Sequence, residues 1–364
     1  MPDDRRFPEC LSELLRSFGL GPPLKIHRSG GTATPKFAVQ VPEGRFVVRA
    51  RPAEFAAERL IRFDHASLWR LVEHGLPVPQ PLRRADGTSW FSSAQGVFEV
   101  LSWVEGDAFQ EGDRAAITAL GGFLARFHAA LGENIPPGKE GMRREDHPDL
   151  LAPYVTQLRE LCHTQRDKLQ MDRLAQQLEL VRASLDHDLY PKLPKAVIHG
   201  DIHPGNVKFK GAQVAAVYDF DYLSEQARCR DLVDALMFFA ASRRDQVNPD
   251  DIRSLTQPFV PNPEWSSWLL TGYQQVSRLS DLEWSALPWL IRSQWIQIRL
   301  RGSRKVGREE KLSFVMDGFF EVIDWLDLEA ADFFGRLRSR HGISPIPKAQ
   351  SEPLPLTPSD GNHC

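Results

Sequence analysis

The stretch that most constrains the fold of this chain is VIHGDIHPGNVKFKGAQVAAVYDFD, residues 197–221, which gathers polar side chains between hydrophobic runs. Its first apolar residues predict a buried strand that delivers Asp201 to a tight loop. Asn206 follows after four intervening residues, and the apolar run after Gly211 predicts a hairpin that carries Asp219 back beside Asn206. The spacing therefore predicts that three oxygen-bearing side chains converge.

These three side chains suit different tasks. Mg²⁺ takes hard oxygen ligands and usually binds only one or two from protein, with phosphates and water completing its shell. Asn206 and Asp219 fit that role. Asp201 is set apart from them and is placed to accept or orient the proton of an attacking hydroxyl, which phosphoryl transfer requires besides positioning and charge neutralisation.

The chain changes character near residue 106. Before this point, short β-rich runs alternate with Gly and Pro turns, and one helical pattern covers residues 55–74. After it, the stretch 197–221 is the one strand-like island among helical patterns. Those helical patterns lie at 113–131, 149–188 and 264–334.

This change of character predicts an α+β fold in two lobes. Residues 1–105 are expected to form a small antiparallel β-sheet lobe with one helix. Residues 106–340 are expected to form a larger, mostly helical lobe. Residues 341–364 are rich in Pro and Ser and poor in large apolar groups, which predicts a disordered tail.

Charge and cysteine usage narrow the class of partner. A formal net charge of −3 and a pI near 6.4 favour neither nucleic acid nor a membrane surface, so a small molecule is the expected partner. The four cysteines form no CxxC pair, and no window approaches the roughly 20 apolar residues of a membrane span. We therefore expect a cytoplasmic protein that is a monomer or a homodimer.

HGDIHPGN at residues 199–206, followed by YDFD at 218–221, resembles the catalytic and metal-binding motifs of the aminoglycoside phosphotransferase and choline kinase-like family. The resemblance extends along most of residues 20–330. It implies a bilobal protein-kinase-like fold whose N-terminal lobe binds nucleotide, with ATP and Mg²⁺ as cofactors. It also implies Asp201 as catalytic base, with Asn206 and Asp219 as metal ligands. His199 would pack the loop, and Asp231 would brace it through hydrogen bonds.

The same resemblance assigns nucleotide-binding positions in the first lobe. Arg49 takes the place of the family's phosphate-binding lysine on the third strand, and Asp64, within an apolar helical stripe, takes that of its glutamate partner. We therefore expect Arg49 to pair with Asp64. Gly30 and Gly31 are candidates for a turn over the phosphates or for a plain hairpin turn. Ser102 and Val104 lie in VLSWVEG, which resembles the hinge that hydrogen-bonds adenine.

The acceptor substrate is the part of the function that the sequence determines least. The sequence texture is nearest to the homoserine kinase type II-like branch, which implies a small hydroxylated metabolite. A homoserine-like hydroxy amino acid, an amino alcohol and a sugar all stay open. Arg228 and Arg230 are candidates for an acceptor carboxylate or for surface positions. Three tryptophans are candidates for a cationic pocket, although their helical spacing favours core packing, at residues 284, 289 and 295.

Two alternatives to a kinase deserve weight. GDIH at residues 200–203 also resembles the first metal-binding block of a metallophosphoesterase, but no GDxxDRG block follows, and GNH at 361–363 lies in the tail. His203 is accordingly read as a structural residue rather than a metal ligand. A nucleotide-binding regulator with the same fold is the second alternative. Asp201 argues against it, because a binding module needs no base.

Overall fold

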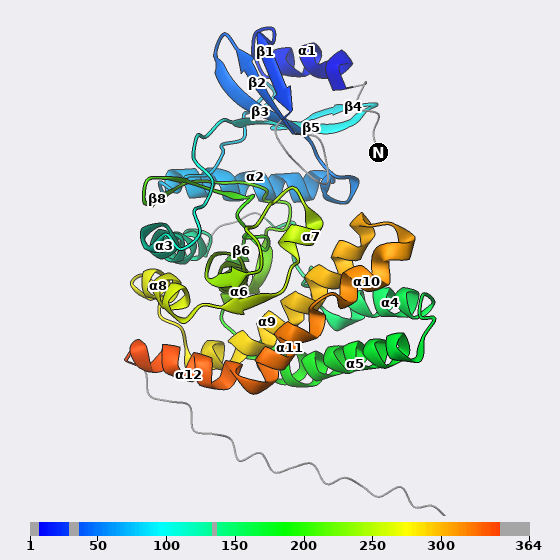
Figure 1. Ribbon diagram of the computed structural model, residues 1–364. Coiled ribbons are helices and arrows are strands. Elements are labelled where there is room, and N and C mark those ends of the chain that lie inside the picture. The colour runs from blue at the N-terminus through cyan, green and yellow to red at the C-terminus, as the bar shows by residue number, and fades with distance from the viewer. Residues whose placement is uncertain (1–6, 29–35, 133–136, 343–364) are drawn as a thin grey trace, which may run out of the picture.

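The N-terminal part of the molecule is built on a five-stranded antiparallel sheet in the order β1-β2-β3-β5-β4 (Figure 1). The computed structural model describes residues 7–28, 36–132 and 137–342. Cross-strand pairs place Lys36 opposite Arg49, and Arg49 opposite Glu99. The strands are β1 (Lys25–Arg28), β2 (Lys36–Val41), β3 (Gly44–Ala50), β4 (Phe91–Ser93) and β5 (Gly96–Ser102).

Two helices accompany this sheet. Helix α2 (Glu58–Glu73) follows a short 3-10 turn (Ala53–Phe55), and together they confirm the helix expected at 55–74. Helix α1 (Phe7–Ser17) was not predicted from the sequence. Its buried leucines, Leu11 and Leu14 among them, pack with Val48 of the sheet in one apolar cluster, so α1 covers a face that would otherwise be exposed.

The remainder of the chain is mostly helical, and the mixed α+β architecture is confirmed. Helix α3 (Arg114–Ala130) matches its predicted span, and the helical pattern at 149–188 separates into α4 and α5. The further helices are α4 (Pro148–Arg159), α5 (Gln165–Val181), α6 (Cys229–Phe239), α7 (Ile252–Leu255), α8 (Pro263–Gln274), α9 (Asp281–Gly302), α10 (Lys311–Met316), α11 (Phe319–Leu328) and α12 (Ala330–Arg340).

Short strands within the helical part carry the candidate site. The hairpin of β7 (Val207–Lys210) and β8 (Gln213–Val217) forms as predicted, turning at Gly211 with φ of 55°. Strand β6 (Lys195–Ile198) pairs with β9 (Ser224–Ala227). A third pair, β10 (Ala241–Arg243) with β11 (Phe259–Pro261), was not anticipated, because runs of three residues carry too little periodicity to be recognised.

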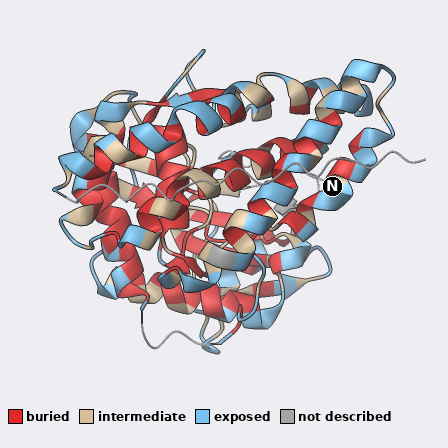
Figure 2. Cartoon of the chain, turned by 90° about the horizontal axis from the view of Figure 1, so that it is seen from below, coloured by how far each residue is buried: buried red, intermediate tan, exposed pale blue. Residues whose placement is uncertain are grey.

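The core of the helical part lies between helices α3, α6, α8 and α9, where buried positions concentrate on the inward faces (Figure 2). Trp284 and Trp295 are fully enclosed in this core and Trp289 is a partly buried residue packed against the core cluster, which confirms core packing over a cationic pocket. The tail expected to be disordered falls, from residue 343 onward, outside the described residues.

Candidate active site

The buried carboxylate of Asp231 holds the loop that carries Asp201 through hydrogen bonds. Asp231, in the first turn of α6, accepts hydrogen bonds from the backbone N–H groups of His199 and Gly200, both at 2.9 Å. His128 of α3 lies 2.9 Å from the same carboxylate. Burial alone would raise the pKa of Asp231, but the His128 hydrogen bond and these backbone donors lower it. The predicted bracing role of Asp231 is confirmed.

The loop then presents Asp201 next to Asn206. The Asn206 side-chain amide donates to the backbone carbonyl of Asp201 at 2.9 Å and to its carboxylate at 3.0 Å. His203 Nε2 lies 3.6 Å from Asp201 Oδ2. Burial would raise the pKa of Asp201, but His203 lowers it below its ordinary value. Asp201 is therefore ionised at neutral pH, the state a proton acceptor requires.

His199 and His203 have different surroundings. His199 is fully buried, and its Nε2 lies 2.9 Å from the Tyr218 carbonyl, in agreement with its predicted packing role. The pKa of His203 is raised above its ordinary value. Burial lowers this pKa, but the nearby Asp201 carboxylate raises it by more. His203 is thus an ion-pair partner of Asp201, which the sequence did not indicate.

Asp219 occupies a strained backbone position at the end of the hairpin. Its φ of 68° is the one left-handed value at a non-glycine residue in the described part of the chain. The hydrogen bond from Tyr218 N to Asn206 O, at 2.8 Å, holds this turn against the catalytic loop. Asp219 therefore comes back beside Asn206, as the spacing predicts.

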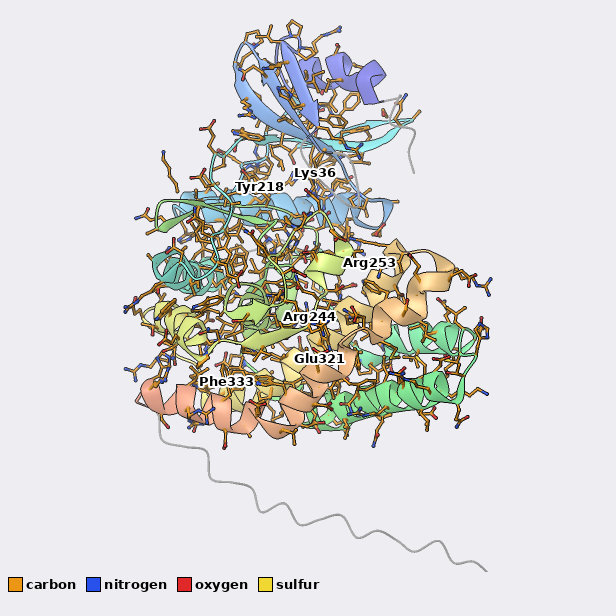
Figure 3. The ribbon with its side chains drawn as sticks, in the orientation of Figure 1. Lys36, Tyr218, Arg244, Arg253, Glu321 and Phe333 are labelled. Carbon is orange, nitrogen blue, oxygen red and sulfur yellow. The ribbon has the colours of Figure 1, made fainter. Side chains whose placement is uncertain are left out.

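Two basic side chains hold the Asp219 carboxylate. Lys36 Nζ lies 2.7 Å from Oδ2, and Arg49 donates to Oδ1 at 3.0 Å. Burial would raise the pKa of Asp219, but Lys36 and Arg49 lower it strongly. Figure 3 labels Lys36, the first residue of β2, and Tyr218, the residue before Asp219. The sequence analysis did not identify Lys36 as a site residue. Its position shortly after Gly30 and Gly31, and its pairing with Arg49 across the sheet, both point to the site.

The oxygen atoms of this site suit a hard divalent cation. Asp219 interacts electrostatically with Asp201, and both lie on the loop and hairpin that carry Asn206. Asp219 and Asn206 are the oxygen-bearing side chains that would hold such an ion. Within the described residues, no group of three or more His, Cys, Asp or Glu side chains is arranged to bind a metal.

The expected pair of Arg49 with Asp64 does not form. Arg49 instead contacts Glu99, Asp219 and Asp221. Asp64 contacts Arg51, and Lys139 Nζ lies 2.6 Å from its carboxylate. Alternation along β3 places Arg49 and Arg51 on the same face, so two arginines compete for nearby acids and the sequence does not say which acid each takes.

Arg49 and Asp64 belong to one buried network of three basic and three acidic side chains. Arg51 donates to Glu99 at 3.0 Å, and Lys139 donates to the Asp221 carbonyl at 2.8 Å. The buried charges are therefore compensated, as burial requires. Lys139, Glu99 and Asp221 were not recognised as site residues, since their partners lie far away in sequence. The members are Arg49, Arg51, Lys139, Asp64, Glu99 and Asp221.

The hinge candidates lie where β5 ends. Ser102 Oγ accepts from Gln80 N at 2.8 Å, and Ser102 N donates to Gln80 O at 2.9 Å. The Val104 carbonyl accepts a hydrogen bond from the Tyr218 hydroxyl. This hydrogen bond links the segment after β5 to the residue before Asp219. Gly30 and Gly31 lie outside the described residues.

Arg228 and Arg230 both form ion pairs within the protein, Arg228 as a half-buried and Arg230 as a buried residue. Arg228 Nε lies 2.7 Å from the buried Glu283. Arg230 donates to Gln294 at 2.7 Å and lies 3.4 Å from Asp146. Arg228 immediately precedes α6, and Arg230 lies in its first turn. Their contacts with Glu283 and Gln294 link α6 to α9.

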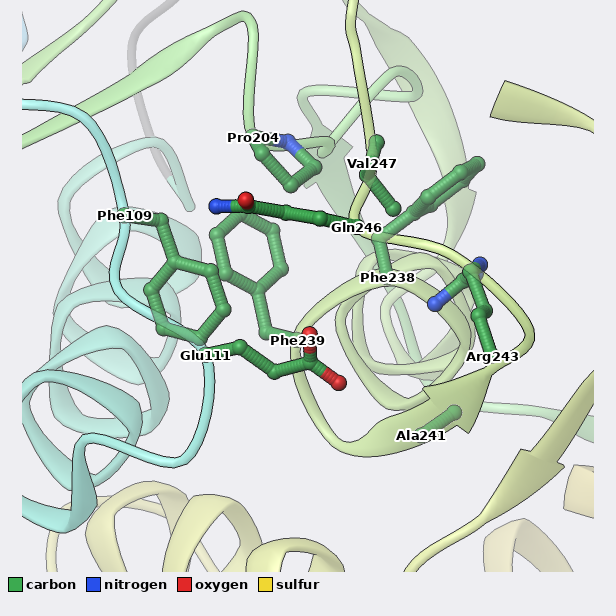
Figure 4. A pocket seen from close by; sticks show the side chains of 9 residues that line it. All are labelled: Phe109, Glu111, Pro204, Phe238, Phe239, Ala241, Arg243, Gln246 and Val247. Carbon is green, nitrogen blue, oxygen red and sulfur yellow. The ribbon is translucent and has the colours of Figure 1, made fainter. Parts of the chain in front are cut away.

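A pocket with aromatic walls lies beside the catalytic loop (Figure 4). Pro204 lies over the rings of Phe109 and Phe239, and Glu111 and Arg243 line the same pocket. Arg243 donates to the Met237 carbonyl, and burial lowers its pKa to about 10.

A small antiparallel sheet, a hinge and a braced loop with Asp201, Asn206 and Asp219 together define a protein-kinase-like phosphotransferase. Comparison of the sequence gives the family. The model of the phosphotransferase enzyme family, APH, matches residues 26–269. The chain belongs to this family and is a small-molecule kinase, a phosphotransferase with an alcohol group as acceptor.

Sequence relatives and solved structures agree. The chain is 27% identical to a homoserine kinase of Gluconobacter oxydans over 299 residues, 80% of this chain and 86% of that enzyme. It is 28% identical to a homoserine kinase of Phenylobacterium zucineum, over 77% and 80% of the two chains.

Two solved kinases share the fold. An amicoumacin kinase in complex with AMP-PNP, Ca²⁺ and Ami superposes with a TM-score of 0.66, at 15% identity, over 88% of this chain and 93% of that one. A microcompartment-associated aminopropanol kinase gives a TM-score of 0.60, at 15% identity, over 88% and 98% of the two chains.

No helix in the described residues is long and apolar enough to span a membrane.

Proposed function

We propose that this protein transfers the γ-phosphoryl group of ATP, in a Mg²⁺-dependent reaction, to the hydroxyl of a small metabolite. The observation that carries this proposal is the braced loop that brings Asp201 and Asn206 together beside Asp219. Candidate acceptors are a homoserine-like hydroxy amino acid, an amino alcohol and a sugar. The homoserine kinases among the relatives favour the first. The scattered cysteines Cys162 and Cys229, neither of which forms a disulfide, support a cytoplasmic location.

Each residue has a defined task in this reaction. Asp201 would orient the acceptor hydroxyl and take its proton as the new phosphorus–oxygen bond forms and the bond to the leaving ADP oxygen breaks. Asp219 and Asn206 would bind Mg²⁺, which neutralises charge on the phosphates. Arg49 and Lys36, both on Asp219, would face the same phosphates. The hinge at Ser102 and Val104 and the glycines at 30 and 31 would bind the rest of the nucleotide.

The two aspartates provide the test. We expect Asp219→Ala to lose Mg²⁺-dependent binding of a nonhydrolysable ATP analogue, because it removes a metal ligand. Asp201→Asn should bind the analogue and lose ADP release, since it removes only the proton acceptor. Calorimetric titration and an ADP-release assay measure the two effects. Asp172→Asn, in an exposed ion pair with Arg159, is the matched control.

Equal loss of nucleotide binding in both variants would contradict separate roles for the two aspartates. ADP release without acceptor should be slow and should rise about tenfold or more with the right alcohol, a change of about 1.4 kcal/mol in the barrier.

A further inference from the structure

Arg49 has a carboxylate partner within the sheet itself. Strands β3 and β5 place Arg49 directly opposite Glu99, so the two side chains leave the same face of the sheet at neighbouring positions. Arg49 Nε donates to Glu99 Oε1, and Glu99 is only 2% exposed. The acid that holds Nε of Arg49 is therefore supplied by the sheet and not by α2.

The contact at Nε fixes the direction in which the guanidinium group points. Nε is the guanidinium nitrogen nearest the main chain, and the planar group carries Nη1 and Nη2 beyond it. Nη1 donates to Asp219 at 3.0 Å, and Nη2 donates to Asp221. Glu99 thus holds the guanidinium plane from the sheet side, while both terminal nitrogens are directed at the segment that carries the candidate metal ligand Asp219.

Helix α2 holds the Glu99 carboxylate through a buried histidine. His65 Nε2 lies 2.7 Å from Glu99 Oε2, and His65 Nδ1 lies 2.7 Å from the Ser89 hydroxyl. Burial would raise the pKa of Glu99, but Arg49 and Arg51 lower it well below its ordinary value. Because an ionised carboxylate only accepts hydrogen bonds, Nε2 carries the proton of that contact. His65 therefore orients Glu99 as a hydrogen-bond donor.

Asp64, the residue before His65 on α2, has different partners. Its carboxylate contacts Arg51 and Lys139, and Lys139 comes from the segment between α3 and α4. Arg51 joins the two sets of contacts, since it also donates to Glu99 at 3.0 Å. Two adjacent residues of α2 are thus used differently, one toward the helical part of the molecule and the other toward the acid that holds Arg49.

We propose that Glu99 and His65 are positioning residues for Arg49, so that α2 acts on the phosphates of the donor through His65 and Glu99 and not through Asp64. The inference rests on the proposed phosphotransfer and adds the residues that orient its phosphate-binding base. The phosphates would meet a guanidinium group that is already held in one orientation, which reduces the entropy lost on binding.

Substitutions at His65 separate positioning from general stability. His65→Leu removes the donor and leaves the charges of Arg49, Arg51 and Glu99 in place. His65→Gln keeps an N–H donor at the end of the side chain and is the conservative variant. Ser89→Ala is milder, because it removes only the hydroxyl behind the imidazole. The matched control is the leucine substitution of the exposed histidine at the C-cap of α2, His74→Leu. Thermal unfolding checks that each variant is folded.

The Nε–H resonance of Arg49 in ¹⁵N NMR spectra, identified by its loss in Arg49→Lys, reports the order of the guanidinium group without any substrate. We expect its exchange with solvent to be about tenfold faster in His65→Leu, because a buried hydrogen bond to a charged group is lost. Ser89→Ala should give a smaller change in the same direction. His65→Gln and His74→Leu should match the unmodified protein.

Calorimetric titration in the presence of Mg²⁺ compares a nonhydrolysable ATP analogue with adenosine, which lacks the phosphates. We expect His65→Leu to bind the analogue about tenfold more weakly, a loss equal to one charged hydrogen bond, and to bind adenosine as the unmodified protein does. A general loss of structure would instead weaken the binding of both ligands.

Unchanged Arg49 exchange in His65→Leu, equal weakening of analogue and adenosine binding, or equally fast exchange in His65→Gln and His65→Leu would each overturn the proposal. Failure of the proposed function is distinguishable from these outcomes. In that case Arg49 exchange follows the expected order among the variants, but the unmodified protein releases no ADP with any acceptor.

Discussion

At the scale of single residues, the site contains a carboxyl group whose charge the fold suppresses. Asp234 on α6 accepts from Gln294 at 2.7 Å and from Ile202 N at 3.4 Å. Burial raises its pKa to about 7, Arg230 opposes this shift, and Asp231 and Asp201 reinforce it. Asp234 is therefore largely protonated when Asp201 is ionised, which limits the negative charge beneath the catalytic loop.

This raised pKa predicts a pH-dependent stability. The unfolded chain releases the Asp234 proton near pH 4, about three units below the folded protein, so this contribution to stability is present below pH 4 and is lost as the pH rises to about 7. Asp234→Asn removes it. The free energy of unfolding of the variant minus that of the unmodified protein should therefore increase by up to about 1.4 kcal/mol per pH unit between these limits. Urea unfolding at several pH values measures the difference, and parallel profiles would refute it.

At the scale of elements, the braced loop depends on a close helix crossing. Helix α3 provides His128 for Asp231, and Tyr273 of α8 lies 3.1 Å from the other nitrogen of that imidazole. The helices approach at two glycines. A Cβ on Gly121 would lie 2.0 Å from the Leu269 carbonyl oxygen, and one on Gly272 would lie 1.9 Å from a carbonyl of α3. Backbone atoms leave no room to adjust.

Alanine at either glycine should separate α3 from α8. We expect Gly121→Ala and Gly272→Ala each to lower the free energy of unfolding by about 3 kcal/mol, the upper range for overpacking. Gly335→Ala on α12 is the matched control, since its Cβ would meet nothing within 4 Å. It should stabilise the protein by about 0.5–1 kcal/mol through helix propensity. Thermal unfolding compares the melting temperatures of the three variants. Similar changes in all three would show that the crossing of α3 and α8 has room for a Cβ at these glycines.

At the scale of the whole molecule, the sheet and α2 are joined to the helical part by buried ionic contacts. Lys36 and Arg49 reach Asp219, while Lys139 reaches back to Asp64 and to the Asp221 carbonyl. Lys139 is fully buried and comes from the segment between α3 and α4. It holds α2 against the segment that follows the β7–β8 hairpin, which is the relative position that the proposed nucleotide binding needs.

Removing this contact should loosen α2 selectively. Lys139→Met leaves Asp64 with Arg51 alone, and breaking a buried ion pair in this way costs about 3–5 kcal/mol. We expect faster amide hydrogen exchange in α2, with α6 and α9 little changed. Arg62→Ala is the control, because its pair with Glu58 on the same helix is exposed on both sides. Uniformly faster exchange throughout the chain would contradict a local role for Lys139.

The sequence by itself determined the α+β architecture and the loop and hairpin of residues 197–221, whereas only the family resemblance implied the bracing role of Asp231. These features depend on local periodicity, turn residues and fixed spacing, which a chain carries along its length. The helix at 55–74 and α3 were predictable for the same reason. Helix α1 was missed because it is short and its packing partners lie on strands that follow much later.

The tertiary structure alone decided which charges meet. Arg49 pairs with Glu99, Asp219 and Asp221, and not with Asp64, because neighbouring strands and the Lys139 segment bring several acids within reach of two adjacent arginines. Arg228, a candidate in the sequence for an acceptor carboxylate or for a surface position, is half-buried in the fold and pairs with Glu283. Which charged side chains pair depends on their distance and burial in the folded protein, and local sequence predicts neither quantity.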